Sequence, residues 1–150
     1  MSAEITARNL TDQFRLAFPA IEDRYQEELN SWKGEFPGNY NVFAFVFNPF
    51  LRIELARAHN DHFRVQFCGF MERVCLSNDK EAINVLWLKV FKVLLADAET
   101  VKALWPLMGS ATKANLADAA LRWGLIRSIP AAGLVGGLRH WADLATATDE

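Results

Sequence analysis

The sequence predicts an all-α fold, and three observations lead to that class. Residues 79–96 (DKEAINVLWLKVFKVLLA) carry apolar side chains around most of a helical wheel, which is typical of a helix with neighbours on at least two sides. Elsewhere, apolar residues recur every three or four positions between turn signals, as in amphipathic helices. The alternating residues Phe43, Phe45 and Phe47 would suit a strand, but no second alternating run could pair with them, so no sheet is expected.

The length and composition favour one compact domain. The chain has 150 residues, 51% of them hydrophobic, so a single helical domain over 1–150 is expected, with frayed ends at 1–3 and 146–150. Short links between successive helices predict antiparallel hairpins. The predicted architecture is a HEAT-like, right-handed array of about seven stacked helices without a sheet.

The first two helices are expected at residues 4–17 and 20–33, on either side of Pro19. The second helix has apolar residues at spacings of four, four and three on one side, which predicts a buried face. Its other face is the most acidic surface in the sequence, with four carboxylates (Glu22, Asp23, Glu27 and Glu28) and only Arg24 and Lys33 as nearby cations. Two interpretations stay open: an ordinary solvated helix face, or an acidic patch that faces a partner.

A third helix is expected at Pro49–Ala58. The residue before a proline is biased away from helical geometry, so Asn48 is interpreted as the N-cap and Pro49 as the first helical residue. The aromatic residues before Asn48 would then form an extended or one-turn segment against the core.

The next helix is expected to start with a cap at Asp61 and to run to about Leu76. The short link 77–79 predicts an antiparallel hairpin between this helix and the central one. Asn78 or Asp79 is expected to cap the central helix, because side-chain oxygens of these residues accept bonds from free N–H groups at a helix start.

Three further helices are expected towards the end of the chain, at Glu99–Met108, Ala111–Trp123 and Leu134–Ala145. Ser110 is interpreted as the cap of the second of these, and Gly124 as the residue that ends it.

Charge and hydropathy argue against several functions. The net charge of −2 and the lack of a dense basic cluster argue against nucleic-acid binding. The longest apolar stretch is too short and too charged to span a membrane, and the first residues do not resemble a signal peptide.

The cysteines indicate a reducing compartment. Cys68 and Cys75 lie seven residues apart on one expected helix, about 10 Å apart along its axis, which is too far for a disulfide. Two buried free thiols of low reactivity are therefore expected, and a cytosolic (cytoplasmic) location with them.

No candidate catalytic, metal or cofactor site emerges from the motifs. His59 and His62 are close in sequence but lack the further ligands that zinc requires. The glycines in 133–137 lack the lysine and the preceding strand of a phosphate-binding loop. The protein is therefore not expected to be an enzyme, and no cofactor is expected.

Four short motifs carry a resemblance to a known group of proteins: residues 47–51 (FNPFL), 70–72 (FME), 77–79 (SND) and 84–85 (NV). The block 32–123 that contains them resembles a family of small, mostly uncharacterised bacterial helical proteins. The resemblance implies a HEAT-like stack of antiparallel helices. Similar small proteins occur among the immunity proteins of secreted polymorphic toxins, so the resemblance also suggests that role.

The first functional hypothesis is an immunity protein that binds a cognate toxin domain and occludes its active site. A rigid helical scaffold without catalytic groups, rich in Trp and Tyr, fits such a role, because these residues are frequent anchors of protein interfaces. An acidic patch would steer association with a basic partner. The residues expected to face the partner are Glu22, Asp23, Glu27, Glu28, Glu35 and Tyr40.

Two alternatives of other classes stay open. One is a small-molecule-binding or enzymatic helical domain with a pocket lined by Phe43, Phe45, Phe47 and Trp87. The other is a scaffold or adaptor module that uses a concave helical face.

Overall fold

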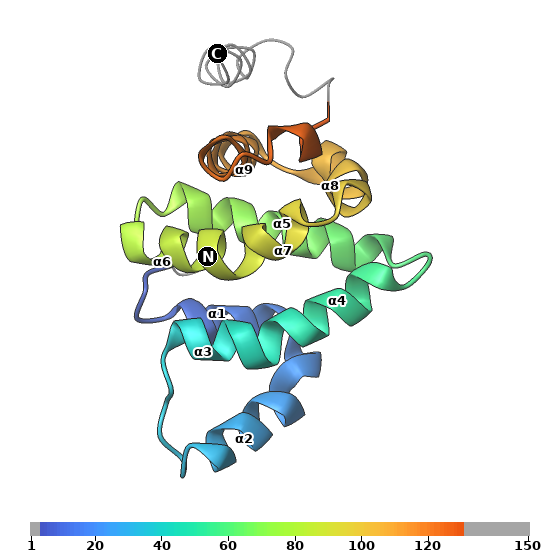
Figure 1. Ribbon diagram of the computed structural model, residues 1–150. Helices are drawn as coiled ribbons and strands as arrows, with labels where there is room; N and C mark the ends of the chain where they lie inside the picture. Colours follow the sequence, from blue (N-terminus) through green and yellow to red (C-terminus); the bar gives the residue numbers. More distant parts are fainter. Residues whose placement is uncertain (1–3, 131–150) are drawn as a thin grey trace.

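The computed structural model describes residues 4–130, and every regular element in that range is helical, with no strand (Figure 1). The prediction of an all-α fold is therefore confirmed. The α-helices are α1 (Leu10–Ala17), α2 (Glu22–Ser31), α3 (Asn39–Val42), α4 (Asn48–Ala56), α5 (Asp61–Leu76), α6 (Lys80–Val85), α7 (Lys92–Leu95), α8 (Ala98–Leu104) and α9 (Ser110–Arg122). Short 3₁₀ turns are η1 (Pro19–Ile21), η4 (Trp105–Leu107) and η5 (Ile126–Ser128).

Two long helices each contain a π-helical turn. The segment η2 (Phe43–Phe47) joins α3 to α4, and η3 (Leu86–Phe91) joins α6 to α7, so continuous helices run over residues 39–56 and 80–95. The predicted central helix is thus present. Asp79 caps it as expected, because its side chain accepts a bond from the Ala82 N–H at 3.0 Å.

The predicted helix start at Asn48 is wrong, since the helix begins nine residues earlier, at Asn39. The reason is the π turn. In a regular α-helix the Pro49 ring would press against the carbonyl of Phe45, four residues back. Here the Asn48 N–H bonds to the carbonyl of Phe43, five residues back, and this wider turn lets the helix continue through the proline.

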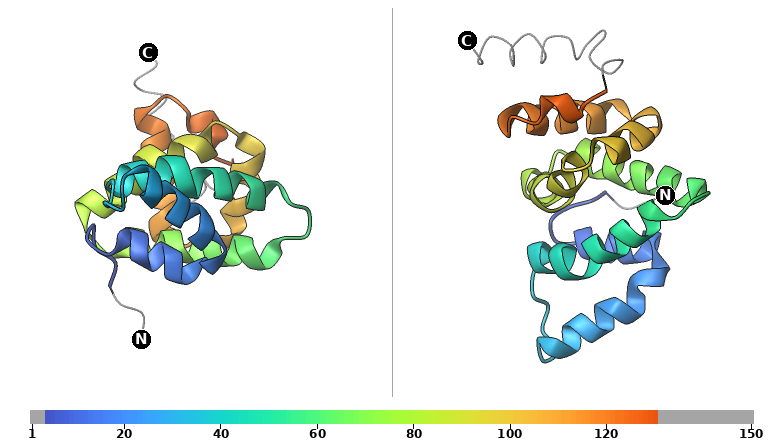
Figure 2. Two further views of the ribbon diagram at one scale, coloured as in Figure 1. Left: turned by 90° about the horizontal axis from the view of Figure 1, so that it is seen from below. Right: turned by 45° about the vertical axis from the view of Figure 1, so that its right-hand side comes forward.

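The helices form successive tiers, with α2 at one end and α8 and α9 at the other (Figures 1 and 2). In between, α5 and the 80–95 helix run in opposite directions, as the hairpin prediction requires. Asn78 turns the chain between them with a φ of +58°. The helix α5 is the common neighbour, because it packs against α1, α4, α6 and α9.

The core is dominated by phenylalanine, and Phe14 lies at its centre. The Phe14 ring stacks on Phe47 with 4.0 Å between ring centroids and meets the rings of Phe43, Phe70 and Phe18. Burying one such side chain contributes roughly 1.5–3 kcal/mol relative to leaving it exposed. These ring contacts therefore hold α1, η2 and α5 together.

Several helix boundaries differ from the expectation. The first helix begins at Leu10 rather than at residue 4. Asp61 and Ser110 do not cap their helices through their side chains, and each is instead the first helical residue. Gly124 does end α9 in a left-handed conformation, with a φ of +69°. The expected helix at Leu134–Ala145 and the frayed ends lie outside the described residues.

Candidate partner-binding surface

The described residues contain no arrangement suited to metal catalysis. Across residues 4–130, no three His, Cys, Asp or Glu side chains come together in a way that could hold a metal ion. His59, in the loop between α4 and α5, and His62, in the first turn of α5, are both exposed. In the same range, no helix is long and apolar enough to cross a membrane.

The two cysteines are unpaired and buried. Cys68 lies against the Leu104 carbonyl, and burial raises the pKa of both Cys68 and Cys75 to about 12. Thiols with so high a pKa stay protonated at neutral pH, and the thiolate is the nucleophilic form. These side chains are therefore part of the core rather than reactive groups.

Three of the six residues expected to face a partner form hydrogen bonds with other residues of the protein. Glu22 accepts a bond from Arg15 Nε at 2.9 Å and a second one from Arg15 Nη2. These bonds hold the pKa of the Glu22 carboxyl below its usual range. The Tyr40 hydroxyl accepts a bond from Asn84 Nδ2 at 2.7 Å, and Glu28 accepts one from Trp32 Nε1 at 2.9 Å.

The other three residues, Asp23, Glu27 and Glu35, are exposed. None of them forms an ion pair with another described residue. The structure therefore divides the predicted set: Glu22 fastens α2 to α1, whereas Asp23 and Glu27 on α2 and Glu35 in the loop after it carry exposed negative charge.

Sequence reasoning missed three exposed aromatic side chains, at the C-cap of α2, in the loop after it and in η2. Trp32, Phe36 and Phe45 are 42%, 54% and 60% exposed. A pocket of about 440 Å³ lies between α2 and η2, and it is lined by Phe45, by the carboxylates of Glu27 and Glu28, and by Arg24 and Ser31. We define the acidic–aromatic surface by the following residues: Asp23, Glu27, Glu28, Trp32, Glu35, Phe36 and Phe45.

For Phe45 the sequence contained a pattern that could have indicated its exposure. Phe45 alternates with Phe43 and Phe47, and the helix that contains them points Phe45 to the opposite side from its two neighbours. Phe43 and Phe47 are buried in the core at 1% and 0% exposure. Trp87, the fourth residue expected in the alternative pocket, lies with its ring centroid 6.0 Å from that of Trp123 in a T-shaped arrangement.

Comparison with known proteins places the chain in a family. A family model described as a domain of unknown function (DUF7674) matches residues 11–124. The chain belongs to this family. The match runs from α1 to the glycine after α9, so the DUF7674 domain includes the whole acidic–aromatic surface. No curated protein and no solved structure matches it.

Proposed function

We propose that this DUF7674 domain is an immunity protein, which binds a cognate bacterial toxin domain and neutralises it by covering its active site. The observation that carries the proposal is the acidic–aromatic surface. Exposed apolar side chains that gather in one patch rimmed by polar groups mark interaction sites, and Trp and Tyr are among the residues that contribute most to binding.

The arrangement around the pocket between α2 and η2 supports a protein partner. Phe45 provides an apolar contact, and the carboxylates of Glu27 and Glu28 lie beside it. A basic side chain of a partner, such as an arginine, could place its stem on the aromatic ring and its charged end between the carboxylates. Toxins that act on nucleic acids carry basic surfaces of this kind, because their substrates are anionic.

The anchoring of α2 supports a preformed surface. Arg15 bonds to Glu22 and also lies over the Tyr25 ring, 4.2 Å from its centroid. These contacts fix α2 against α1 before any partner arrives. A preformed surface loses less conformational entropy on binding than a mobile one. The stacked hairpin of α5 and the 80–95 helix supports a HEAT-like array as part of the same proposal, and two free thiols fit a cytoplasmic location.

The proposal is tested by co-expression with the product of the neighbouring gene. If that product is a toxin, the wild-type protein should restore growth of the producing cells. The double variant Glu27→Lys/Phe45→Ala should bind the purified toxin domain more weakly, by roughly 2–4 kcal/mol as expected for an anchor residue and a reversed charge. The matched control is Glu81→Lys, which reverses an exposed charge on α6. Equal rescue and equal affinity for both variants would show that the acidic–aromatic surface does not bind the toxin.

A further inference from the structure

A second groove, separate from the acidic–aromatic surface, runs between the 39–56 helix and the 80–95 helix. It consists of two adjoining pockets of about 530 Å³ and 500 Å³, which share Arg52 and Val93. The first lies beside the π turns and the second reaches the start of α8. The apolar lining of the two pockets includes Ala44, Ile53, Leu55, Leu88 and Val93.

The two π turns form facing walls of this groove. Ala44 comes from η2, and Leu88 and Lys89 come from η3. Asn48 joins the walls, because its Nδ2 donates a bond to the Lys89 carbonyl at 2.7 Å. Single π turns inside α-helices occur frequently at functional sites. Leu88 and Ile53, which line this pocket, are 37% and 44% exposed.

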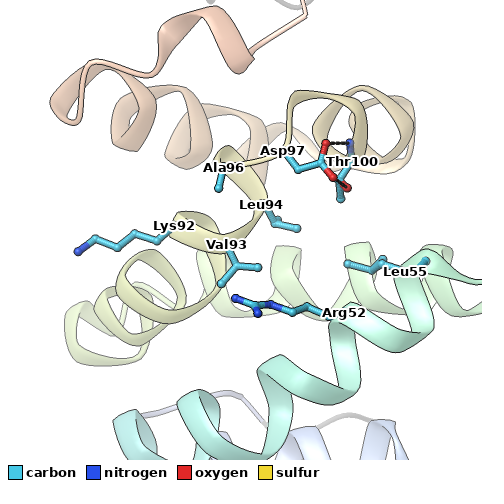
Figure 3. A pocket seen from close by; sticks show the side chains of 9 residues that line it. Arg52, Leu55, Lys92, Val93, Leu94, Ala96, Asp97 and Thr100 are labelled. Atoms are coloured by element: carbon cyan, nitrogen blue, oxygen red, sulfur yellow. Dashed lines mark hydrogen bonds between the residues drawn. The ribbon is translucent and has the colours of Figure 1, made fainter.

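The charge of the groove is positive. Arg52, Lys89 and Lys92 line it, with Asp97 as the acidic lining residue. Figure 3 shows Arg52 extending from α4 towards Val93, while Lys92 points away from the other lining residues. The Asp97 carboxylate caps α8, because it accepts bonds from the Glu99 and Thr100 N–H groups at the start of that helix.

Arg52 is one of several arginines without an ion pair in the range 4–130, with Arg8, Arg24 and Arg127. Arg15, Arg57, Arg64 and Arg122 each pair with a carboxylate. Arg52 and Lys89 have no ion pair with any residue in the range 4–130. The groove therefore combines apolar side chains with two cations that have no carboxylate partner in this range.

We propose that this basic groove binds an acidic, amphipathic segment of a partner protein. A segment of this kind places apolar side chains on Ile53, Leu88 and Val93 and carboxylates near Arg52 and Lys89. The length of the groove favours a peptide over a small anion, because the two pockets follow one another along a helix pair. The apolar lining and the negative charge of the whole chain disfavour nucleic acid. The site is opposite in charge to the acidic–aromatic surface and does not depend on the function proposed for that surface.

The test uses a synthetic amphipathic peptide of about 14 residues, with leucines at i, i+3, i+4 and i+7 and glutamates at most other positions. Titration into the ¹⁵N-labelled full chain should shift the amide signals of Ala44, Ile53, Leu88 and Val93. The same peptide with glutamine in place of glutamate should bind much more weakly, and salt should weaken the binding of the acidic peptide.

Variants then separate the groove from general charge attraction. Arg52→Glu/Lys89→Glu should reduce the affinity for the acidic peptide by roughly tenfold, since two charges change sign at the site. Lys80→Glu/Lys102→Glu changes the total charge equally at exposed positions outside the groove and should leave the affinity unchanged. Spectra of the free variants report on the fold. Absence of binding, signal shifts confined to other surfaces, equal loss in both variants, or equal binding of the glutamine peptide would each overturn the proposal.

Discussion

The carboxylate of Glu72 in α5 closes the first turn of α9 by binding Thr112. Its Oε1 accepts a bond from the Thr112 N–H at 2.7 Å and another from the Thr112 hydroxyl at 2.8 Å, and Oε2 accepts one from the Ala111 N–H. Thr112 is fully buried, and its side chain also forms a hydrogen bond with the Cys75 thiol. A charged group from one helix thus caps another, and the negative charge lies at the positive end of the α9 dipole.

Replacing this carboxylate should destabilise the protein. We expect Glu72→Ala to lower the free energy of unfolding by about 1–3 kcal/mol, because it removes a helix cap and the carboxylate acceptor of a buried hydroxyl. Urea denaturation followed by circular dichroism measures the change. Glu81→Ala, at an exposed site on α6, is the control and should stay within about 0.5 kcal/mol of wild type. A value for Glu72→Ala inside the same range would show that the cap contributes little.

The effect of replacing Gly109 should depend on the Glu72 carboxylate. Its φ of −75° suits any residue, but a Cβ there would overlap the carboxyl group of Glu72. Gly109→Ala should therefore displace the cap and cost about 1–2 kcal/mol in the wild-type background. In the Glu72→Ala background the same change should cost almost nothing. A double-mutant cycle measures this coupling, and additive costs would contradict the explanation.

Asn48 should stabilise the junction of the two π turns. Asn48→Ala removes the donor to the Lys89 carbonyl and should cost about 1–2 kcal/mol. Asn48→Asp should cost more at neutral pH, because a carboxylate has no N–H to donate and its charge would face the carbonyl oxygen. Denaturant midpoints of the two variants measure the difference. If aspartate and asparagine are equally stable at pH 7, the bond to Lys89 is not significant.

The cysteines should resist alkylation in the folded protein. With their pKa near 12, the thiolate fraction of Cys68 and Cys75 at pH 8 is roughly a thousandfold below that of an unperturbed thiol. Reaction with iodoacetamide should accordingly be slow in buffer and fast in denaturant, as followed by mass spectrometry. Rapid modification of either residue under native conditions would indicate that this part of α5 opens readily.

The Arg15–Glu22 pair should make a small contribution that disappears in acid. The folded-state pKa of Glu22 lies below its unfolded value, so the stabilisation is present above about pH 4.3 and is lost as the pH falls through the folded pKa. Because the Glu22 side chain is 42% exposed, solvent limits the effect to less than about 1 kcal/mol. Glu22→Gln should be slightly less stable than wild type at pH 7 and equally stable near pH 2. Thermal unfolding at several pH values tests this, and a difference that persists in strong acid would point to another cause.

The sequence was most informative where the signals are local. The helix Asp61–Leu76 has the expected bounds, because the polar link 77–79 interrupts a run of helical periodicity. The cap by Asp79 follows from a bond to a residue three positions away. The all-α class follows from the absence of paired alternating segments. In each case the deciding contacts lie within a few residues along the chain.

The errors arise where the deciding contact is distant in sequence. Ser110 fits the local rule for a cap, but Glu72, almost forty residues earlier, occupies that place. The start expected at Asn48 assumed regular α-helical geometry, and a π turn departs from that geometry to accommodate Pro49. Exposure of Phe45 could not be read from its type, since the side of the 39–56 helix that stays uncovered depends on how α1 and α2 pack.

The π turn before Pro49 also determines how the helix would respond to a change in chain length. A π turn holds one residue more than the α-helical turn it replaces, because its bond reaches five residues back instead of four. The flanking segments therefore face the same way as they would in a helix one residue shorter. Deleting Phe45 would leave Phe43 towards the core and Arg52 towards the groove, but the turn would return to regular α geometry, in which the Pro49 ring presses against the carbonyl four positions back. The deletion should therefore break the helix at the proline without rotating its two halves against each other.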